Sequence, residues 1–181
     1  MKYYKVSWEE LEKDCFELAK KLKNHKFDRI LCISRGGLVW ARMFSDLLSL
    51  PVSHLTVVSY QDLKQQKETK ITETPNNLKN QRFLVIDEIV DTGKTLKVVI
   101  DYLKSLKLNR FSTLAPIVRS FSKPLPDFYL KIIDEWVIFP YEFKETVNAF
   151  VKIFKSQNKA KEKLLQVGFE KQKIDEIFQG S

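Results

Sequence analysis

The chain has 181 residues, of which 44% are hydrophobic and 12% aromatic, and this suits one domain built around one core. It contains no apolar run of membrane-spanning length and no apolar signal core at its N-terminus, so we expect a cytoplasmic protein without a membrane partner. The net charge of +8 suits either an anionic partner, a polyphosphate or a nucleic acid, or a solvated surface rich in lysine.

The first predicted element is an amphipathic helix. Ser7 and Glu10 have the spacing of a capping box, and apolar residues then recur at steps of three and four up to Leu22. The next elements alternate between strand and helix patterns, and Gly36 and Gly37 end the first of these strands. They are a buried strand at 28–34, a helix at 38–48 and a β-branched strand at 52–58.

The stretch 60–81 is polar and rich in lysine. A polar stretch of this length inside a compact domain is usually a lid or a disordered loop, and we predict one of these here. Cys15 and Cys32 lie in apolar patterns without metal or disulfide spacing, so we predict reduced packing residues. His25 and His54 have no companion ligands and are predicted to be surface or edge residues.

The second half continues the alternation and ends in helices, with Gly168 ending the one before last. Alternating strands and helices predict an α/β fold with a mainly parallel sheet and helices on both faces. No linker is long enough to separate domains, so we predict one domain over 1–181. The predicted elements are strands at 83–86 and 111–118, extended pieces at 129–133 and 135–139, and helices at 95–106, 143–154, 159–167 and 171–178.

The segment "FLVIDEIVDTGKTL", residues 83–96, places two acids directly after a buried strand and before Gly-Lys-Thr. A nucleoside-triphosphate loop needs a glycine where Glu88 stands, so that interpretation fails. A ribose 5-phosphate fits better, because Asp87 and Glu88 can accept hydrogen bonds from its 2- and 3-hydroxyls. The backbone amides from Asp91 to Thr95, with the hydroxyls of Thr92 and Thr95, can hold the 5-phosphate at a helix N-terminus.

The part "LVIDEIVDTGKTL" resembles the phosphoribosyl-pyrophosphate (PRPP) motif of the type I phosphoribosyltransferases. Three further segments fit the same family. The segment "ISRGGLVWARMFSDLL" resembles the pyrophosphate loop and its helix. Ser59-Tyr60 and the polar stretch after them lie where the family has its mobile lid. "DEWVIFPYE", residues 134–142, resembles the purine-binding hood of the xanthine-guanine and hypoxanthine branch. The resemblance covers about 27–142, does not include the first predicted helix and leaves 143–181 as a helical extension.

The resemblance implies a role for each matching residue. Asp87 and Glu88 would lie beside a Mg²⁺ ion that bridges pyrophosphate and the ribose hydroxyls. Asp91 would accept the proton near N7 of the purine, although it also suits a helix N-cap. The remaining PRPP contacts would come from Ser34, Arg35, Gly36 and Gly37 for pyrophosphate, and from Thr92, Gly93, Lys94 and Thr95 for the 5-phosphate.

Three residues would bind the base. Trp136 would stack on it, with core packing as the alternative, and the carbonyls of Trp136 and Val137 would meet its 2-position edge. The purine enzymes usually place a lysine against the 6-oxo group. The matching position here is Arg119, with Lys123 as the alternative.

These features predict a purine salvage phosphoribosyltransferase that joins guanine, hypoxanthine or xanthine to PRPP and releases pyrophosphate and the nucleotide. One alternative is a regulator on the same fold that senses PRPP and binds nucleic acid; another is a transferase for a base such as orotate. We expect a homodimer or a higher homo-oligomer and no nucleic-acid partner. The amphipathic tail is compatible with packing on the domain, joining a dimer interface or covering a neighbour's site.

Overall fold

The computed structural model describes residues 2–61, 67–76 and 78–179. The chain divides into two compact units. The larger unit spans Glu12–Asp134, and the smaller one joins the residues before this range to those after it. The single domain over the whole chain stays a prediction.

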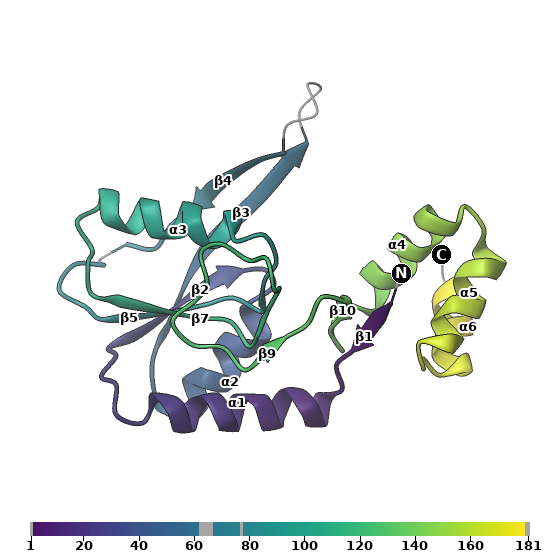
Figure 1. The fold of residues 1–181 in the computed structure, drawn as a ribbon, viewed down its shortest axis with the longest axis horizontal. Coiled ribbons are helices and arrows are strands. Elements are labelled where there is room, and N and C mark those ends of the chain that lie inside the picture. Colours follow the sequence, from purple (N-terminus) through teal and green to yellow (C-terminus); the bar gives the residue numbers. More distant parts are fainter. Residues whose placement is uncertain (1, 62–66, 77, 180–181) are drawn as a thin grey trace. The chain divides into compact units, whose positions relative to one another are not determined.

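The larger unit is built on a five-stranded sheet (Figure 1). Its strands are β2 (Arg29–Ser34), β3 (Val52–Gln61), β4 (Lys67–Glu73), β5 (Phe83–Ile86) and β7 (Phe111–Leu114). Their order is β4-β3-β2-β5-β7, and every pair is parallel except β3 with β4. The predicted mainly parallel sheet is therefore confirmed.

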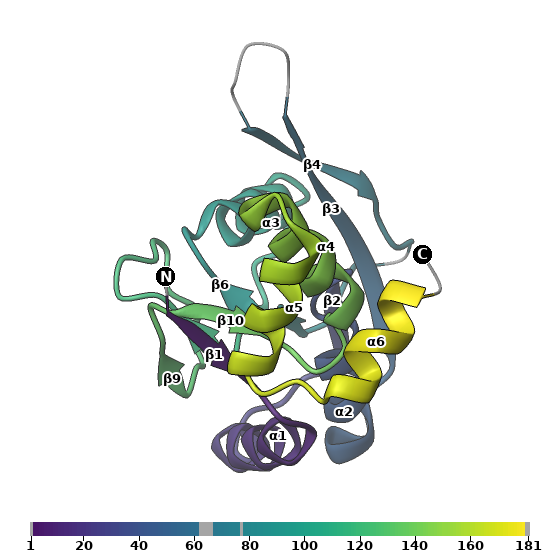
Figure 2. The ribbon, with the colours of Figure 1, turned by 90° about the vertical axis from the view of Figure 1, so that its right-hand side faces the viewer.

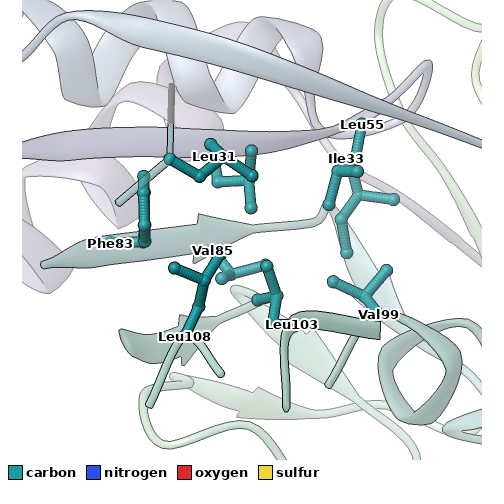
Figure 3. Close-up of a cluster of buried hydrophobic side chains, with 9 residues drawn as sticks. Leu31, Ile33, Leu55, Phe83, Val85, Val99, Leu103 and Leu108 are labelled. Carbon is teal, nitrogen blue, oxygen red and sulfur yellow. The ribbon is translucent and has the colours of Figure 1, made fainter. Parts of the chain in front are cut away.

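Helices cover both faces of this sheet because its central strands are apolar on both sides. All four residues of β5 are buried, as are the middle four of β2. Figure 3 shows one face, where Leu31, Ile33 and Val85 pack with Val99 and Leu103 of α3 (Lys94–Ser105). On the opposite face lie α2 (Leu38–Leu48) and α1 (Trp8–Leu22) (Figure 1).

The N-terminal part of α1 confirms half of the predicted capping box. The backbone amide of Glu10 donates to the Ser7 hydroxyl over 3.1 Å, whereas the Glu10 carboxylate accepts from the Tyr4 hydroxyl. Farther along α1, the buried Asp14 forms a 2.5 Å ion pair with Lys131. Among the described helices, none combines the length and the apolar character needed to cross a membrane.

Two stretches of the larger unit differ from the sequence-based expectation. The stretch 60–81 is not wholly a loop, because β3 continues to Gln61 and Lys67–Glu73 forms β4, an antiparallel hairpin that Figure 2 shows projecting from the sheet. The single strand predicted at 111–118 is divided into β7 and β8 (Ile117–Val118) around Ala115-Pro116. Strand β8 pairs in a second, parallel sheet with β6 (Ile89–Val90) and β9 (Lys131–Ile132).

The smaller unit combines a two-stranded sheet with three helices. Strand β1 (Tyr3–Lys5), which the sequence did not predict, pairs in parallel with β10 (Trp136–Ile138). The helices are α4 (Phe143–Phe154), α5 (Gln157–Gln166) and α6 (Lys171–Gln179), as the periodicity predicts to within two residues. They enclose a core of their own, formed by Ile138, Val147, Phe150, Ala160, Leu164 and Ile174.

The cysteines are packing residues, as predicted. Cys15 and Cys32 are fully buried and are not joined to each other. Burial raises the pKa of each thiol to about 12, so neither is a reactive thiolate at neutral pH. The histidines also match their expected places at surfaces and edges: His25 packs against Phe27 and Phe128, and His54 Nδ1 lies 3.3 Å from the Ser34 hydroxyl.

Candidate active site

A polar cavity of about 340 Å³ opens where β5 ends. Its wall is formed by the segment that follows β5, by the first turn of α3 and by one residue of β4. The lining residues are Thr69, Asp87, Glu88, Ile89, Val90, Asp91, Thr92, Gly93, Lys94, Thr95 and Leu96. The cavity therefore gathers both acids and the whole predicted phosphate loop at the carboxyl edge of a parallel sheet, where open α/β folds bind ligands.

The first acid, Asp87, is fixed by the main chain around it. Its side chain is buried, its backbone amide donates to the Leu114 carbonyl over 3.0 Å, and its Oδ1 accepts from the Glu88 amide over 3.0 Å. Burial raises the pKa of Asp87, while the hydrogen bonds from Glu88 oppose that shift. The carboxyl is thus held rigidly at the cavity wall in surroundings that disfavour its charge.

The second acid, Glu88, reaches the loop that follows β2. A Cβ atom on Gly36 would lie 1.8 and 2.0 Å from the two carboxylate oxygens of Glu88, so the glycine makes room for this side chain. The Gly37 amide donates to the Ile33 carbonyl over 3.0 Å, and the Ser34–Arg35 peptide bond is cis. The loop predicted to hold pyrophosphate and the acid pair are therefore neighbours in the structure.

The phosphate loop turns into α3 at Gly93. Its φ of +89° is left-handed, and a Cβ atom there would meet the Lys123 carbonyl oxygen at 2.1 Å, so two features require glycine. Helix α3 begins at Lys94 with Gly93 as its N-cap, so the capping alternative for Asp91 is wrong. With Thr92 and Thr95 in the same wall, this helix N-terminus faces the cavity and suits an anion.

Asp91 is instead paired with Arg119. The guanidinium Nε of Arg119 donates to Asp91 Oδ1 over 3.0 Å, and its Nη1 donates to the Ile133 carbonyl over 2.7 Å. Arg119 follows β8, which brings the residue predicted to contact the base next to the residue predicted to accept its proton. The alternative, Lys123, has an exposed side chain, and its backbone amide donates to the Thr92 carbonyl over 3.2 Å.

The two predicted hood residues lie in the smaller unit. Trp136 and Val137 are in β10, where Val137 is buried and Trp136 is half-buried. The Trp136 ring packs in the core of that unit, with its centroid 6.2 Å from that of Tyr3, so the packing alternative describes at least part of its role. Its contact with a base stays a prediction.

The predicted lid is described only in part. The backbones of Ser59 and Tyr60 lie in β3, paired with Thr69 and Glu68 of β4, whereas residues 62–66 and 77 lie outside the described part of the chain. The cavity wall also contains four residues that the sequence analysis did not name individually: Thr69 of the stretch 60–81, Ile89, Val90 and Leu96. The signal for Thr69 was the β-branched residues of "KETKITE", Thr69, Ile71 and Thr72, which favour a strand.

The acid pair is compatible with a magnesium ion. Mg²⁺ is usually bound by one or two carboxylates together with substrate oxygens and waters, and Asp87 and Glu88 supply two adjacent carboxylates in one polar wall. A site made wholly of protein ligands is a different case. Within residues 2–61, 67–76 and 78–179, no group of three or more His, Cys, Asp or Glu side chains is placed to hold a metal.

Comparison with known proteins agrees with this geometry. Residues 7–147 match the sequence model of the phosphoribosyl transferase domain. The chain belongs to this family. The xanthine-guanine phosphoribosyltransferase of Idiomarina loihiensis is 32% identical to it over 149 residues, which are 76% of this chain and 85% of that protein. The predicted membership of the phosphoribosyltransferase family is thereby confirmed.

Solved phosphoribosyltransferase structures share the fold. The purine phosphoribosyltransferase from Pyrococcus horikoshii is 31% identical, with a TM-score of 0.71 over 78% of this chain and 94% of that one. The xanthine-guanine-hypoxanthine phosphoribosyltransferase of Helicobacter pylori is 26% identical, with a TM-score of 0.71 over 81% and 98%. These relatives place the chain in the purine branch of the type I phosphoribosyltransferases.

Proposed function

We propose that this phosphoribosyltransferase serves purine salvage, joining a 6-oxopurine to PRPP and releasing pyrophosphate and the nucleoside monophosphate. The observation that carries the proposal is the cavity itself, which combines two carboxylates for ribose hydroxyls with a helix N-terminus for a phosphate. The purine activities printed in the names of its relatives support the choice of base.

In the proposed reaction the chain binds PRPP along this wall. Asp87 and Glu88 accept hydrogen bonds from the ribose hydroxyls, while Thr92 to Thr95 hold the 5-phosphate. Ser34 to Gly37 hold the pyrophosphate that leaves as the purine attacks C1 through N9. Asp87 and Glu88 would hold a Mg²⁺ ion, which would neutralise charge on that leaving group.

Asp91 is the proposed proton acceptor. As N9 attacks C1, the purine must lose the proton it carries near N7, and an ionised carboxylate there can take it. Arg119 fixes the orientation of this carboxylate through its 3.0 Å contact, and it is also the proposed donor to the 6-oxo group. Trp136 is proposed to stack on the base, with the carbonyls of Trp136 and Val137 toward its 2-position edge.

The arrangement at the base predicts a substrate order. Arg119 is a hydrogen-bond donor, and the 6-amino group of adenine also donates. The two groups would face each other with their hydrogens, and neither would find an acceptor. Guanine or hypoxanthine should therefore react at least about 10²-fold better than adenine in kcat/KM. Xanthine should follow them, because carbonyls at the 2-position accept from the guanine amino group and repel a 2-oxo group.

The test is to measure nucleotide formation from PRPP with guanine, hypoxanthine, xanthine, adenine and orotate, each with and without Mg²⁺. Formation of a 6-oxopurine nucleotide that depends on Mg²⁺ supports the proposal. Adenine reacting as well as guanine contradicts the assigned base contacts, and orotate as the preferred base contradicts the purine function. Tight PRPP binding without turnover of any base would instead favour the PRPP-sensing regulator.

We further propose that the enzyme acts in the cytoplasm as a homodimer or a larger homo-oligomer and needs no nucleic-acid partner. Large apolar side chains are exposed on the described surface, among them Phe121 with 57% and Ile132 with 60% of its area accessible. Side chains of this kind can be buried in a contact between subunits. Light scattering of the purified protein measures the assembly directly. A monomer at assay concentrations contradicts this part of the proposal.

A further inference from the structure

Trp136 is held at its backbone by the N-terminal strand. Its amide donates to the Lys2 carbonyl over 3.1 Å, and Tyr3 is its direct partner in the parallel register of β1 with β10. Two residues on, the Val6 amide donates to the Ile138 carbonyl over 2.9 Å. Strand β1 thus fixes the path of the strand that carries Trp136.

Tyr3 also supports the Trp136 side chain. The two rings are tilted by 36°, and their centroids lie 6.2 Å apart, within the distance range of favourable aromatic pairs. Two further neighbours of Tyr3 come from the C-terminal helices. The ring of Phe150 in α4 lies 5.0 Å away, and Lys163 Nζ in α5 lies 5.2 Å from the Tyr3 centroid. Tyr3 therefore connects Trp136 to two helices.

This support comes from outside the shared domain. The family match covers residues 7–147, which includes Trp136 but leaves out Tyr3, Phe150 and Lys163. Phe150 is fully buried, so the helices form a firm base for the Tyr3 ring. Trp136 itself is only half-buried, which leaves part of its ring available for stacking.

We infer that Tyr3 is a positioning residue for the purine base, acting through Trp136, and that α4 and α5 of the C-terminal extension hold it in place. The inference rests on the proposed function, because it assumes that Trp136 stacks on the base. It gives the extension a role in base binding rather than in PRPP binding. An aromatic ring whose tilt is fixed binds a planar base without first being ordered.

The experiment compares Tyr3→Leu, Tyr3→Phe and the unaltered 181-residue chain. Tyr3→Leu should raise the KM for the purine about 2- to 10-fold, the range expected for loss of one aromatic pair. The kcat and the KM for PRPP should stay nearly unchanged. Tyr3→Phe, which keeps the ring, should have the same KM for the purine as the unaltered enzyme. If Tyr3→Leu yields no folded protein, Tyr3→Met replaces it with the same expectation.

Two controls separate positioning from general stability. Phe178→Leu alters the same hydrophobic core at a ring over which Lys161 Nζ lies, and it should lower the melting temperature without changing the KM for the purine. In a Trp136→Leu background, adding Tyr3→Leu should have no further effect on that KM, because the two residues act as one unit.

The outcomes are distinct. Equal KM values for the purine in Tyr3→Leu and the unaltered enzyme overturn the inference, as does a matching rise in Phe178→Leu or in the KM for PRPP. Full additivity with Trp136→Leu also overturns it. An unaltered enzyme that converts no purine overturns the proposed function instead, so the two failures are told apart.

Discussion

Asp87 is a buried carboxyl at the end of β5, and burial raises its pKa. An acid whose pKa is raised on folding binds its proton more tightly in the folded state than in the unfolded state. The free energy of unfolding therefore falls as the pH rises from the unfolded pKa through the folded one, and the penalty is complete above both. A buried charge that lowers the stability of the fold is a feature expected of a functional site.

We therefore expect Asp87→Asn to raise the melting temperature at neutral pH by about 2–4 °C, since the amide keeps the shape without the buried charge. The advantage should shrink as the pH is lowered toward the unfolded pKa of an aspartate. Together with Glu88→Gln, the change should abolish most turnover, because charge-assisted hydrogen bonds to the ribose contribute about 1.5–3 kcal/mol each. Near-normal rates with PRPP in the double variant would refute the ribose assignment.

Asp91 allows a second test on a single residue, because its side chain is 63% exposed and does not cap helix α3. Asp91→Asn should lower kcat by about 10²–10⁴-fold, the usual contribution of a general base, with little change in the KM for PRPP. The melting temperature should change little, because the introduced amide keeps an oxygen that can accept from Arg119, and Arg119 also keeps its hydrogen bond to the Ile133 carbonyl. Asp101→Asn is the matched control, because it breaks the exposed pair with Lys97 on α3 away from the cavity; an equal fall in kcat there would count against a catalytic Asp91.

Among the elements, the hairpin of β3 and β4 contributes Thr69 to the cavity wall. Thr69→Val keeps the shape and the β-branch but removes the hydroxyl. We expect the KM for PRPP to rise about 2- to 10-fold, as for one lost neutral hydrogen bond. Thr72→Val is the control on the same strand, because the Thr72 hydroxyl donates to the Thr56 carbonyl over 3.4 Å and does not line the cavity. Equal effects of the two changes would mean that β4 matters only for stability.

The same hairpin shows what the sequence did not predict. "KETKITE" forms a polar edge strand with Ile71 as its one aliphatic residue, so neither an apolar run nor an alternation of apolar and polar residues marked it as a strand. The split at Ala115-Pro116 was missed for a related reason, because both sides are apolar and β-branched and read as one strand. Buried strands such as β5 and the amphipathic helices were predicted nearly to the residue, since their patterns follow from burial alone.

Pair contacts within the site were beyond sequence reasoning. The motif predicted the roles of Asp91 and Arg119 separately, but their 3.0 Å contact depends on β6 and β8 lying side by side in the second sheet. In the same way, the contact of Tyr3 with Trp136 depends on the pairing of strands from opposite ends of the chain. Such contacts follow from topology, which local patterns do not specify.

The net charge of +8 is spread over the whole molecule and is not confined to one segment. Residues 143–181 carry eight lysines against five acids, which leaves +3 there and +5 in the rest of the chain. The proposed substrates differ sharply in charge, because PRPP is a polyanion and a purine base is close to neutral. A positive field raises the encounter rate of the anion alone, and salt screens that field.

We therefore expect kcat/KM for PRPP to fall several-fold between about 0.02 and 0.2 M salt, as the Debye length shortens from about 20 to 7 Å. The value for the purine should change little. Lys159→Glu with Lys171→Glu lowers the net charge by four at the first turns of α5 and α6, where acids suit the helix dipole and should not harm folding. This variant should show a lower kcat/KM for PRPP at low salt and a weaker salt dependence. Two results would contradict this expectation: an equal effect of salt on both substrates, or an unchanged salt dependence in the double variant. The positive charge would then belong to a solvated lysine-rich surface and would not speed the binding of PRPP.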